Sequence, residues 1–281
     1  MSLRINTDNF SLKEPKETVE RILRFLRDYL DKSEISKLVL GMSGGLDSSV
    51  TAALCAEAVG GRNVLGVYMP EDQTRKDSAS EDANAIANMF HINLRTINIT
   101  NILTTAASTI PIKDRARNQV PYGNVKARIR SMILYYFANI EQRIVVGTGD
   151  KSKIMLGYFT KYGDGACDIL PIADFYKTTV RALAKYLRLP KRVYSKPASP
   201  ELSPGQTASG ELGLGYDRLD EILWGLERLM SDQDIAEQTD MPLQAVRGVR
   251  ARWTGSEHKR RTPLVLKSGL RTAGADMRLP L

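Results

Sequence analysis

The chain has 281 residues, enough for one large domain, and its hydrophobic fraction of 42% and charged fraction of 26% are typical of globular proteins. No apolar run is long enough to span a membrane and no signal peptide is visible, so the cytoplasm is the expected location. The net charge of +8 fits either nucleic acid or a small polyanionic substrate as a partner.

The first predicted element is an amphipathic helix over residues 15–31, which is expected to cover one face of a sheet. An apolar run at residues 37–40 is typical of a buried parallel strand. Ser43-Gly44-Gly45 then turns the backbone sharply, and Asp47-Ser48-Ser49 opens an apolar helix that continues to Val59. Two adjacent glycines let a phosphate approach the main chain, and the helix start supplies free N–H groups and a positive dipole end. This arrangement predicts a phosphate-binding loop.

The loop is not a Walker A motif, because no lysine follows its glycines. Its serines add hydroxyl donors, and the carboxylate of Asp47 could hold Mg²⁺. A Gly-Gly turn capped by Ser and Asp also occurs without any ligand, but the strand before it and the helix after it favour phosphate binding. The stretch resembles the SGGxDS signature of the ATP pyrophosphatases, which cleave ATP between the α- and β-phosphates and transfer AMP.

Strands and helices alternate beyond this loop. Residues 63–69 and 93–99 are predicted strands, with a polar loop at 70–80 and a helix at 81–90 between them. This alternation predicts an α/β fold with a doubly wound parallel sheet flanked by helices. Ligands of such sheets bind beyond the carboxyl ends of the strands, where the glycine loop and the polar loop both lie. Cys55, on the apolar helix, is expected to fill space in the core, and the cysteine spacing predicts neither a disulfide nor a metal site.

A long helix is predicted from Gly123-Asn124 to about Ile140. Lys126, Arg128 and Arg130 crowd its first two turns, where cations oppose the helix dipole. They indicate either a nearby anion or ordinary solvated surface charge. The expected buried stripe of this helix consists of Val125, Ile129, Met132, Ile133, Tyr136, Phe137 and Ile140.

Residues 143–147 are predicted as the fourth core strand, followed by a glycine-rich stretch at 147–172. That stretch is either an ordered surface loop or backbone placed close to a ligand, with carboxylates aimed at it. A helix is predicted over 174–187, with Lys177 in its first turn. The carboxylates of the glycine-rich stretch are Asp150, Asp164 and Asp168.

The last third of the chain is predicted to be helical. Residues 194–212 carry three prolines and no clear periodicity, which indicates a functional lid or a disordered link. Amphipathic helices are predicted at 216–230, 232–238 and 242–253. The basic tetrapeptide at 258–261 is typical of a solvated terminus, with a nuclear signal as the weaker alternative. No internal repeat and no nucleic-acid-binding motif is found.

Taken together, these residues resemble the ammonia-dependent NAD⁺ synthetases over nearly the whole chain. The resemblance implies an adenine nucleotide alpha hydrolase-like fold with a helical C-terminal extension, as a single domain over residues 1–281, with a mobile lid over about 195–212. It implies that deamido-NAD⁺, ATP and ammonia give NAD⁺, AMP and pyrophosphate through an acyl-adenylate, with Mg²⁺ as cofactor. The residues before the loop leave no room for a glutaminase domain. The motifs that carry the resemblance are SGGLDSS, GNVKARIR, GTGDKSK, GYFTKYGDGACDILP, PGQTASGELG and EHKR.

The resemblance also implies site residues, a homodimer with dinucleotide sites at its interface, and neither nucleic acid nor membrane as a partner. The residues implied in catalysis are Ser43, Asp47, Asp164 and Lys177. Those implied in ATP binding are Gly41, Ser43, Gly44, Gly45, Asp47, Ser48, Arg75, Thr148 and Lys177, with Asp47 as the Mg²⁺ ligand. Those implied on the deamido-NAD⁺ side are Arg128, Tyr158, Lys161, Asp164, Asp168, His258 and Lys259, of which His258 and Lys259 match positions near the ATP phosphates.

The chain departs from the family pattern at several positions. Lys153 stands where the family usually has a Glu that helps to bind Mg²⁺. Its ammonium is expected either to approach the pyrophosphate or to pair with Asp150, one helical turn earlier. Ala166 replaces a glycine, Ser203 stands where relatives often carry Trp, and Ala208-Ser209 replaces an acidic pair.

Two other functions share the glycine loop. A tRNA-modifying ATP pyrophosphatase would explain the positive charge, but such enzymes generally place cysteines for sulfur chemistry, and this chain has two unpaired ones. A non-catalytic nucleotide-binding module would not need Asp47 beside a serine-rich loop. Both alternatives fit the residues less well than the synthetase.

Overall fold

The fold is centred on a sheet of four parallel strands. The computed structural model describes residues 4–71, 78–110, 119–196, 210 and 213–272. The strand order is β3-β2-β1-β4, and every neighbouring pair is parallel, which confirms the predicted sheet. The strands are β1 (Leu38–Gly41), β2 (Val64–Tyr68), β3 (Asn93–Thr96) and β4 (Ile144–Val145).

The strand order places a topological switch point between β1 and β4. From β1 the chain moves outward to β2 and β3, and then returns to the other side of β1 to form β4. Because the loops after β1 and β4 leave in opposite directions, the carboxyl ends of these strands flank a natural ligand crevice. The glycine loop follows β1 and Thr148 follows β4. The sheet topology therefore brings two of the predicted motifs together.

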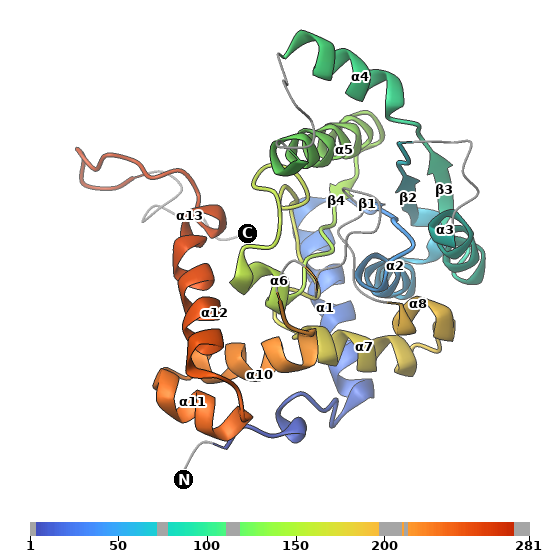
Figure 1. Ribbon diagram of the computed structural model, residues 1–281. Helices are drawn as coiled ribbons and strands as arrows, with labels where there is room; N and C mark the ends of the chain where they lie inside the picture. Colours follow the sequence, from blue (N-terminus) through green and yellow to red (C-terminus); the bar gives the residue numbers. More distant parts are fainter. Residues whose placement is uncertain (1–3, 72–77, 111–118, 197–209, 211–212, 273–281) are drawn as a thin grey trace.

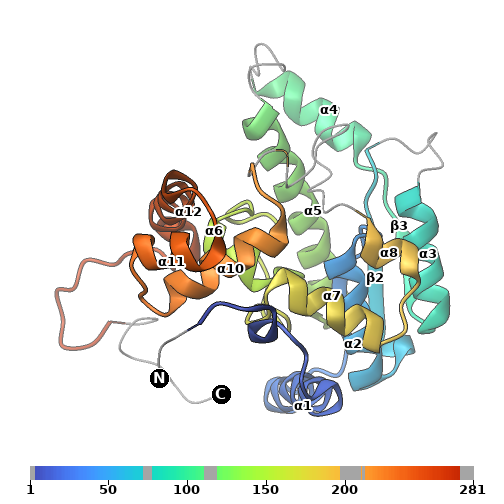
Figure 2. The ribbon, with the colours of Figure 1, turned by 60° about the horizontal axis from the view of Figure 1, so that its bottom comes forward.

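Helices cover both faces of this sheet (Figures 1 and 2). Residues of β1 alternate between two core clusters, since Leu38 and Leu40 join one cluster and Val39 joins the other. The helices of the first cluster are α1 (Pro15–Ser33), α2 (Leu46–Val59), α3 (Ser78–Met89), α7 (Lys177–Tyr186) and α8 (Lys191–Ser195). The helices of the second are α4 (Thr100–Thr109) and α5 (Gln119–Glu141), and two short 3₁₀ turns lie at Thr7–Asn9 and Gly61–Asn63.

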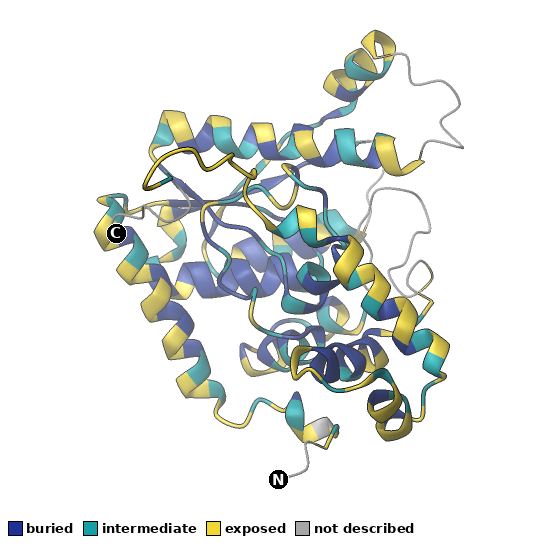
Figure 3. Cartoon of the chain, turned by 90° about the vertical axis from the view of Figure 1, so that its left-hand side faces the viewer, coloured by how far each residue is buried: buried dark blue, intermediate teal, exposed yellow. Residues whose placement is uncertain are grey.

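Helix α2 is buried on almost all sides, because α1 and α7 pack against it and it also contacts the sheet (Figure 3). Its small residues allow this close approach. Cys55 is fully buried, as expected of core filler, and burial raises the pKa of its thiol to about 12. No helix in the described part of the chain is long and apolar enough to cross a membrane.

The C-terminal helices form a third core cluster beside the sheet (Figure 1). They confirm the predicted helical extension. The expected solvated terminus at 258–261 was wrong, because the guanidinium of Arg260 donates to the carbonyl oxygens of Ile154 and Met155, both at 2.9 Å. The helices of this cluster are α6 (Lys151–Leu156), α10 (Tyr216–Glu227), α11 (Asp232–Thr239) and α12 (Leu243–Gly255), and the short α13 (Glu257–Arg260) follows α12 without adding a buried residue.

The expected stripe of α5 was wrong on one side. Ile129, Ile133 and Phe137 are buried against the sheet as predicted. Val125 is half-buried against the same cluster, whereas Met132, Tyr136 and Ile140 are 57%, 59% and 57% exposed. Helical spacing therefore identified apolar residues on two neighbouring faces, of which only one contacts this chain's own core.

Candidate active site

The glycine loop forms a tight turn between β1 and α2. Gly45 caps α2, so the helix begins at Leu46, earlier than predicted, and Asp47 lies in its first turn. Gly44 has φ +76°, in the region that side chains rarely adopt. A β-carbon at Gly44 would also overlap the backbone carbonyl of Ala79 in α3. The conformation and the crowding both require glycine at this position.

Two serine hydroxyls close the loop. The Ser48 hydroxyl oxygen donates to the carbonyl oxygen of Gly45 at 3.1 Å and lies 3.1 Å from the hydroxyl oxygen of Ser43. The Ser43 hydroxyl accepts the Gly45 N–H at 3.2 Å, and the Ser43 N–H donates to Ser48 Oγ at 3.3 Å. Backbone amides and hydroxyls thus converge at the start of a helix, the arrangement that binds phosphate in proteins.

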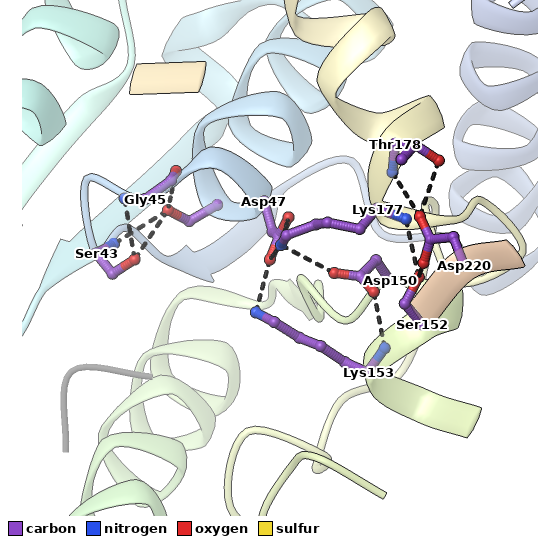
Figure 4. Close-up of polar contacts among 10 residues, drawn as sticks. Ser43, Gly45, Asp47, Asp150, Ser152, Lys153, Lys177, Thr178 and Asp220 are labelled. Atoms are coloured by element: carbon purple, nitrogen blue, oxygen red, sulfur yellow. Dashed lines mark hydrogen bonds and ion pairs between the residues drawn. The ribbon is translucent and has the colours of Figure 1, made fainter. Parts of the chain in front are cut away.

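A cluster of four charged side chains, three of them buried, adjoins the loop (Figure 4). Lys177 Nζ lies 2.5 Å from both carboxylate oxygens of Asp47 and 3.1 Å from Asp150 Oδ2. Lys153 Nζ lies 2.6 Å from Asp47 Oδ2. The predicted pairing of Lys153 with Asp150 was therefore wrong for the ammonium. Lys153 contacts Asp150 through its backbone instead. The Lys153 N–H donates to the side chain of Asp150 at 2.8 Å, and Asp150 is the residue that caps α6.

Opposite charges decide the ionisation of Asp47. Burial alone would raise the pKa of Asp47, but the ammonium groups of Lys153 and Lys177 outweigh it and hold that pKa well below its usual range. Burial likewise would lower the pKa of Lys153, yet the carboxylates of Asp47 and Asp150 outweigh it and raise that pKa. For Asp150, burial dominates and raises the pKa. The Asp47–Lys153 pair is therefore fully charged at neutral pH.

A third buried carboxyl supports this cluster from α10. Asp220 accepts a hydrogen bond from the Ser152 hydroxyl at 2.5 Å and from the Thr178 N–H and hydroxyl at 2.9 and 2.8 Å. The Ser152 hydroxyl in turn accepts the Lys177 N–H at 2.9 Å. Burial raises the pKa of Asp220 to about 7. Asp220 thus ties α6 and α7 together at the point where Lys153 and Lys177 leave their helices.

The arrangement does not fit a metal ion held by Asp47. Mg²⁺ binds oxygens at about 2.0–2.1 Å, and both oxygens of Asp47 are already paired with ammonium groups. Each unit charge of a metal ion about 4 Å from an ammonium group would be repelled by roughly 4 kcal/mol at an effective dielectric constant of about 20. Among the described residues, no group of three or more His, Cys, Asp or Glu side chains is arranged to hold a metal.

The residues predicted on the deamido-NAD⁺ side lie around the segment after α6. Lys161 Nζ donates to the carbonyl oxygen of His258 at 2.6 Å, and Arg128 donates to the carbonyl oxygen of Lys161 at 3.3 Å. Lys259 Nζ donates to the carbonyl oxygens of Gly157 and Phe159 at 2.8 and 2.9 Å. The fold therefore gathers predicted residues from α5, α13 and the glycine-rich stretch.

The two predicted carboxylates of this group also brace the backbone. Asp164 accepts the Thr160 N–H at 2.7 Å, and Asp168 accepts the Val145 N–H of β4 at 2.8 Å. Of the remaining predictions, Gly41 ends β1, Thr148 follows β4 half-buried, Tyr158 is half-buried after α6, and Arg75 lies outside the described residues.

Sequence reasoning missed Asp220, Ser152 and Tyr216 as members of the site. Asp220 had a usable signal, because it lies between Leu219 and Ile222 on the buried side of α10, where a carboxylate needs a specific partner. Tyr216 is 6% exposed, and its hydroxyl has no hydrogen-bond partner among the described residues. Nothing in its local sequence distinguishes it from an ordinary core tyrosine.

Comparisons with known proteins agree on one family. A family model described as NAD synthase matches residues 18–263. The NH(3)-dependent NAD(+) synthetase of Methanococcoides burtonii is 42% identical over 87% of this chain and 92% of its own length. That of Sulfolobus acidocaldarius is 40% identical over 93% of this chain and 92% of its own length.

Solved structures give the same result. The NMN synthetase of Francisella tularensis superposes with a TM-score of 0.78 at 32% identity, over 90% of this chain and 98% of its own. The NH3-dependent NAD synthetase of Campylobacter jejuni gives 0.76 at 28% identity, over 90% and 99%. A glutamine-dependent NAD+ synthetase of Acinetobacter baumannii gives 0.66 at 26% identity over 96% of this chain, but only 50% of that longer chain is covered.

Proposed function

Because this chain belongs to the NAD synthase family, we infer that it is a ligase that amidates deamido-NAD⁺ with ammonia in a reaction that consumes ATP. The observation that carries this conclusion at the level of the site is the glycine loop at the switch point of the sheet, with the charged cluster of Asp47, Lys153 and Lys177 beside it. A carboxylate is a poor acyl donor until it carries a leaving group. The chemistry therefore needs a phosphate site next to a carboxylate site.

We propose that the ATP phosphates bind at the glycine loop. Ser43, Gly44, Gly45 and Ser48 present hydroxyls and backbone amides at the positive end of α2, next to the carboxyl end of β1. The bonds among these groups are 3.1–3.3 Å long, so a charged phosphate oxygen can replace them with shorter, charge-assisted ones. Transfer of AMP to the nicotinate carboxylate then releases pyrophosphate at this loop.

Lys177 acts, in this proposal, by positioning Asp47. Lys177 is 1% exposed and its ammonium bridges Asp47 and Asp150, so the position of Asp47 at the base of the loop is fixed before the substrates bind. Direct contact between Lys177 and the ATP phosphates stays a prediction. Mg²⁺ as a cofactor also stays a prediction. In place of its predicted coordination by Asp47, we propose that the ion accompanies ATP.

We propose that deamido-NAD⁺ lies against the segment between α6 and α7. Tyr158, Lys161, Asp164 and Asp168 come from that segment, Arg128 from α5, and His258 and Lys259 from α13. Their side chains already connect these elements to one another through the bonds described above. A dinucleotide bound there would place its nicotinate end near the glycine loop, where the adenylate forms and ammonia attacks.

The test of function is NAD⁺ formation from purified protein with deamido-NAD⁺, ATP and Mg²⁺. We expect ammonium to support turnover and ammonia-free glutamine not to, since the relatives that the chain matches along most of their length are named as NH(3)-dependent. Equal turnover with glutamine would contradict the nitrogen source. Exchange of label between ATP and pyrophosphate that requires deamido-NAD⁺ would support the adenylate.

Nicotinic acid mononucleotide should be tested as a second substrate in the same assay. The NMN synthetase of Francisella tularensis is similar to this chain along nearly its full length. NMN carries the same nicotinamide group on a mononucleotide, so nicotinic acid mononucleotide is the matching acceptor. We expect deamido-NAD⁺ to give the higher kcat/KM. A higher value for the mononucleotide would reassign the chain as an NMN synthase without changing the chemistry.

We propose that the outer face of α5 is the contact surface of a homodimer. Met132, Tyr136 and Ile140 lie four residues apart, on one stripe of the helix, and each is more than half exposed. Such a stripe is typical of an interaction surface. Tyr136→Glu should convert a dimer into a monomer in sedimentation at micromolar concentration, whereas Tyr186→Glu on α7, which is 42% exposed away from this stripe, should leave the dimer intact. A wild-type protein that sediments only as a monomer would contradict the proposal.

The cytoplasm as location, a single domain over residues 1–281 and the absence of a nucleic-acid partner stay predictions. The proposed lid over 195–212 lies mostly outside the described residues.

A further inference from the structure

We propose that the ammonium of Lys153 is the resident cation of the nucleotide site and takes, beside Asp47, the place of a protein-bound divalent metal ion. The protein then offers Mg²⁺ no site of its own, and a metal reaches the loop only as a ligand of the ATP phosphates. This inference rests on the proposed function only in assuming that the glycine loop binds ATP.

The position of Lys153 is fixed from two sides. Its backbone N–H donates to Asp150, which caps α6, so the start of its side chain cannot shift along the helix. Its ammonium reaches across to Asp47 on α2 at 2.6 Å (Figure 4). The pair thus connects the helix after β1 with the helix after β4, across the switch point where the phosphates are expected.

The two lysines of the cluster have different surroundings. The side chain of Lys177 is 2% exposed and is occupied by both carboxylates. The side chain of Lys153 is 22% exposed, and among the described residues its ammonium donates to Asp47 alone. An ammonium group has three N–H donors. Lys153 therefore keeps donors for an anion that arrives from the solvent side.

The charge balance of the cluster also supports Lys153 as the resident cation. Asp47, Asp150, Lys153 and Lys177 carry two negative and two positive charges when all are ionised, so the cluster is neutral without a metal ion. A glutamate that binds one divalent ion has a net charge of +1, which is the charge of a single lysine. Lys153 therefore supplies the charge that a carboxylate and its metal ion would supply together.

The unpartnered hydroxyl of Tyr216 fits an anion rather than a metal ion. Tyr216 lies beside the cluster, with its ring centre 5.3 Å from Lys177 Nζ. Burial raises the pKa of this phenol, so it stays protonated and is a hydrogen-bond donor that finds no acceptor among the described residues. A neutral phenol adds no negative charge that would attract a metal ion, whereas its O–H is a donor that an anion can use.

The test measures binding of Mn²⁺, a paramagnetic substitute for Mg²⁺, by electron paramagnetic resonance without any nucleotide. We expect the wild-type protein and Lys153→Met to bind no Mn²⁺ at the site. Lys153→Glu should gain one bound Mn²⁺ per chain, because it removes an ammonium group and adds a carboxylate ligand. The further substitution Asp47→Asn in the Lys153→Glu variant should abolish that gain. Lys185→Glu makes the same charge change on the exposed side of α7 and should behave as wild type.

A kinetic measurement tests whether the Lys153 ammonium acts as the resident cation during the reaction. Lys153→Met should lower kcat about 100-fold at saturating ATP and Mg²⁺, the usual effect of removing one group that stabilises developing charge, with the KM for deamido-NAD⁺ nearly unchanged. Thermal denaturation checks that the variant is folded. If it does not fold, the Mn²⁺ measurement on the wild type and Lys153→Glu decides.

Two results would overturn the proposal. One is a wild-type protein that binds one Mn²⁺ per chain without nucleotide and loses it on Asp47→Asn. The other is a folded Lys153→Met variant that keeps the wild-type kcat. Neither depends on which carboxylate substrate is used, and the Mn²⁺ measurement needs no turnover, so failure of the proposed function would be recognised separately.

Discussion

Asp47→Asn should lower kcat for NAD⁺ formation about 100-fold or more while the protein stays folded. The amide keeps the size of the carboxylate but removes the charge that holds Lys177 and Lys153 at 2.5 and 2.6 Å. The expected loss comes from a displaced cluster at the base of the phosphate loop. Because Asp150 remains as a partner of Lys177, unfolding should become easier by no more than about 3–5 kcal/mol, the usual range for breaking a buried pair.

The matched control is Asp174→Asn. Asp174 pairs with Lys151 at 2.9 Å, but its side chain is 91% exposed, so the same chemical change removes only a surface ion pair. Turnover should be unchanged, and the free energy of unfolding should change by at most about 0.5 kcal/mol. Steady-state kinetics and chemical denaturation of both variants measure the two effects. A wild-type kcat for Asp47→Asn would show that the carboxylate plays no part in the reaction.

Gly44→Ala should remove most of the turnover and also destabilise the protein. The methyl group would occupy the space of the Ala79 carbonyl, and the backbone at φ +76° is strained for any side chain. Relief of the overlap requires the loop to move away from α3, which displaces the Ser43 and Gly45 amides. We expect kcat/KM for ATP to fall about 100-fold or more, as expected when the donors at a phosphate site are displaced.

Gly60→Ala separates strain from crowding. Gly60 also has a positive φ, +82°, but a β-carbon there would meet nothing within 4 Å. This variant should lose about 1–3 kcal/mol of stability and keep its activity. If Gly44→Ala behaved in the same way as Gly60→Ala, the contact with Ala79 would not position the phosphate loop.

Local sequence determined the framework of this protein. The apolar run of β1, the turn at Ser43-Gly44-Gly45 and the apolar helix that follows are adjacent in the chain, so their spacing predicts a strand, a phosphate loop and a helix start. The alternation of strands and helices likewise predicted the parallel sheet. Helix α4 was not predicted, because of its described residues only Leu103 is buried and its threonines give weak periodicity.

Tertiary structure alone decided the partners. Lys153 and Lys177 lie 106 and 130 residues from Asp47 in the chain, and they meet it because β4 returns to the side of β1 and places α6 and α7 beside α2. Residue spacing cannot give that contact, because it depends on the order of strands in the sheet. For the same reason the sequence left Lys153 with two possible partners, neither of them Asp47.

The two faces of α5 show the same limit. Helical periodicity identified Ile133 and Tyr136 as members of one apolar stripe, yet the sheet covers the first and leaves the second exposed. The spacing of apolar residues along a helix predicts which face of the helix is apolar. What covers that face is decided by elements that lie far away in the sequence, or by a second chain, since burial is a property of two surfaces in contact rather than of one.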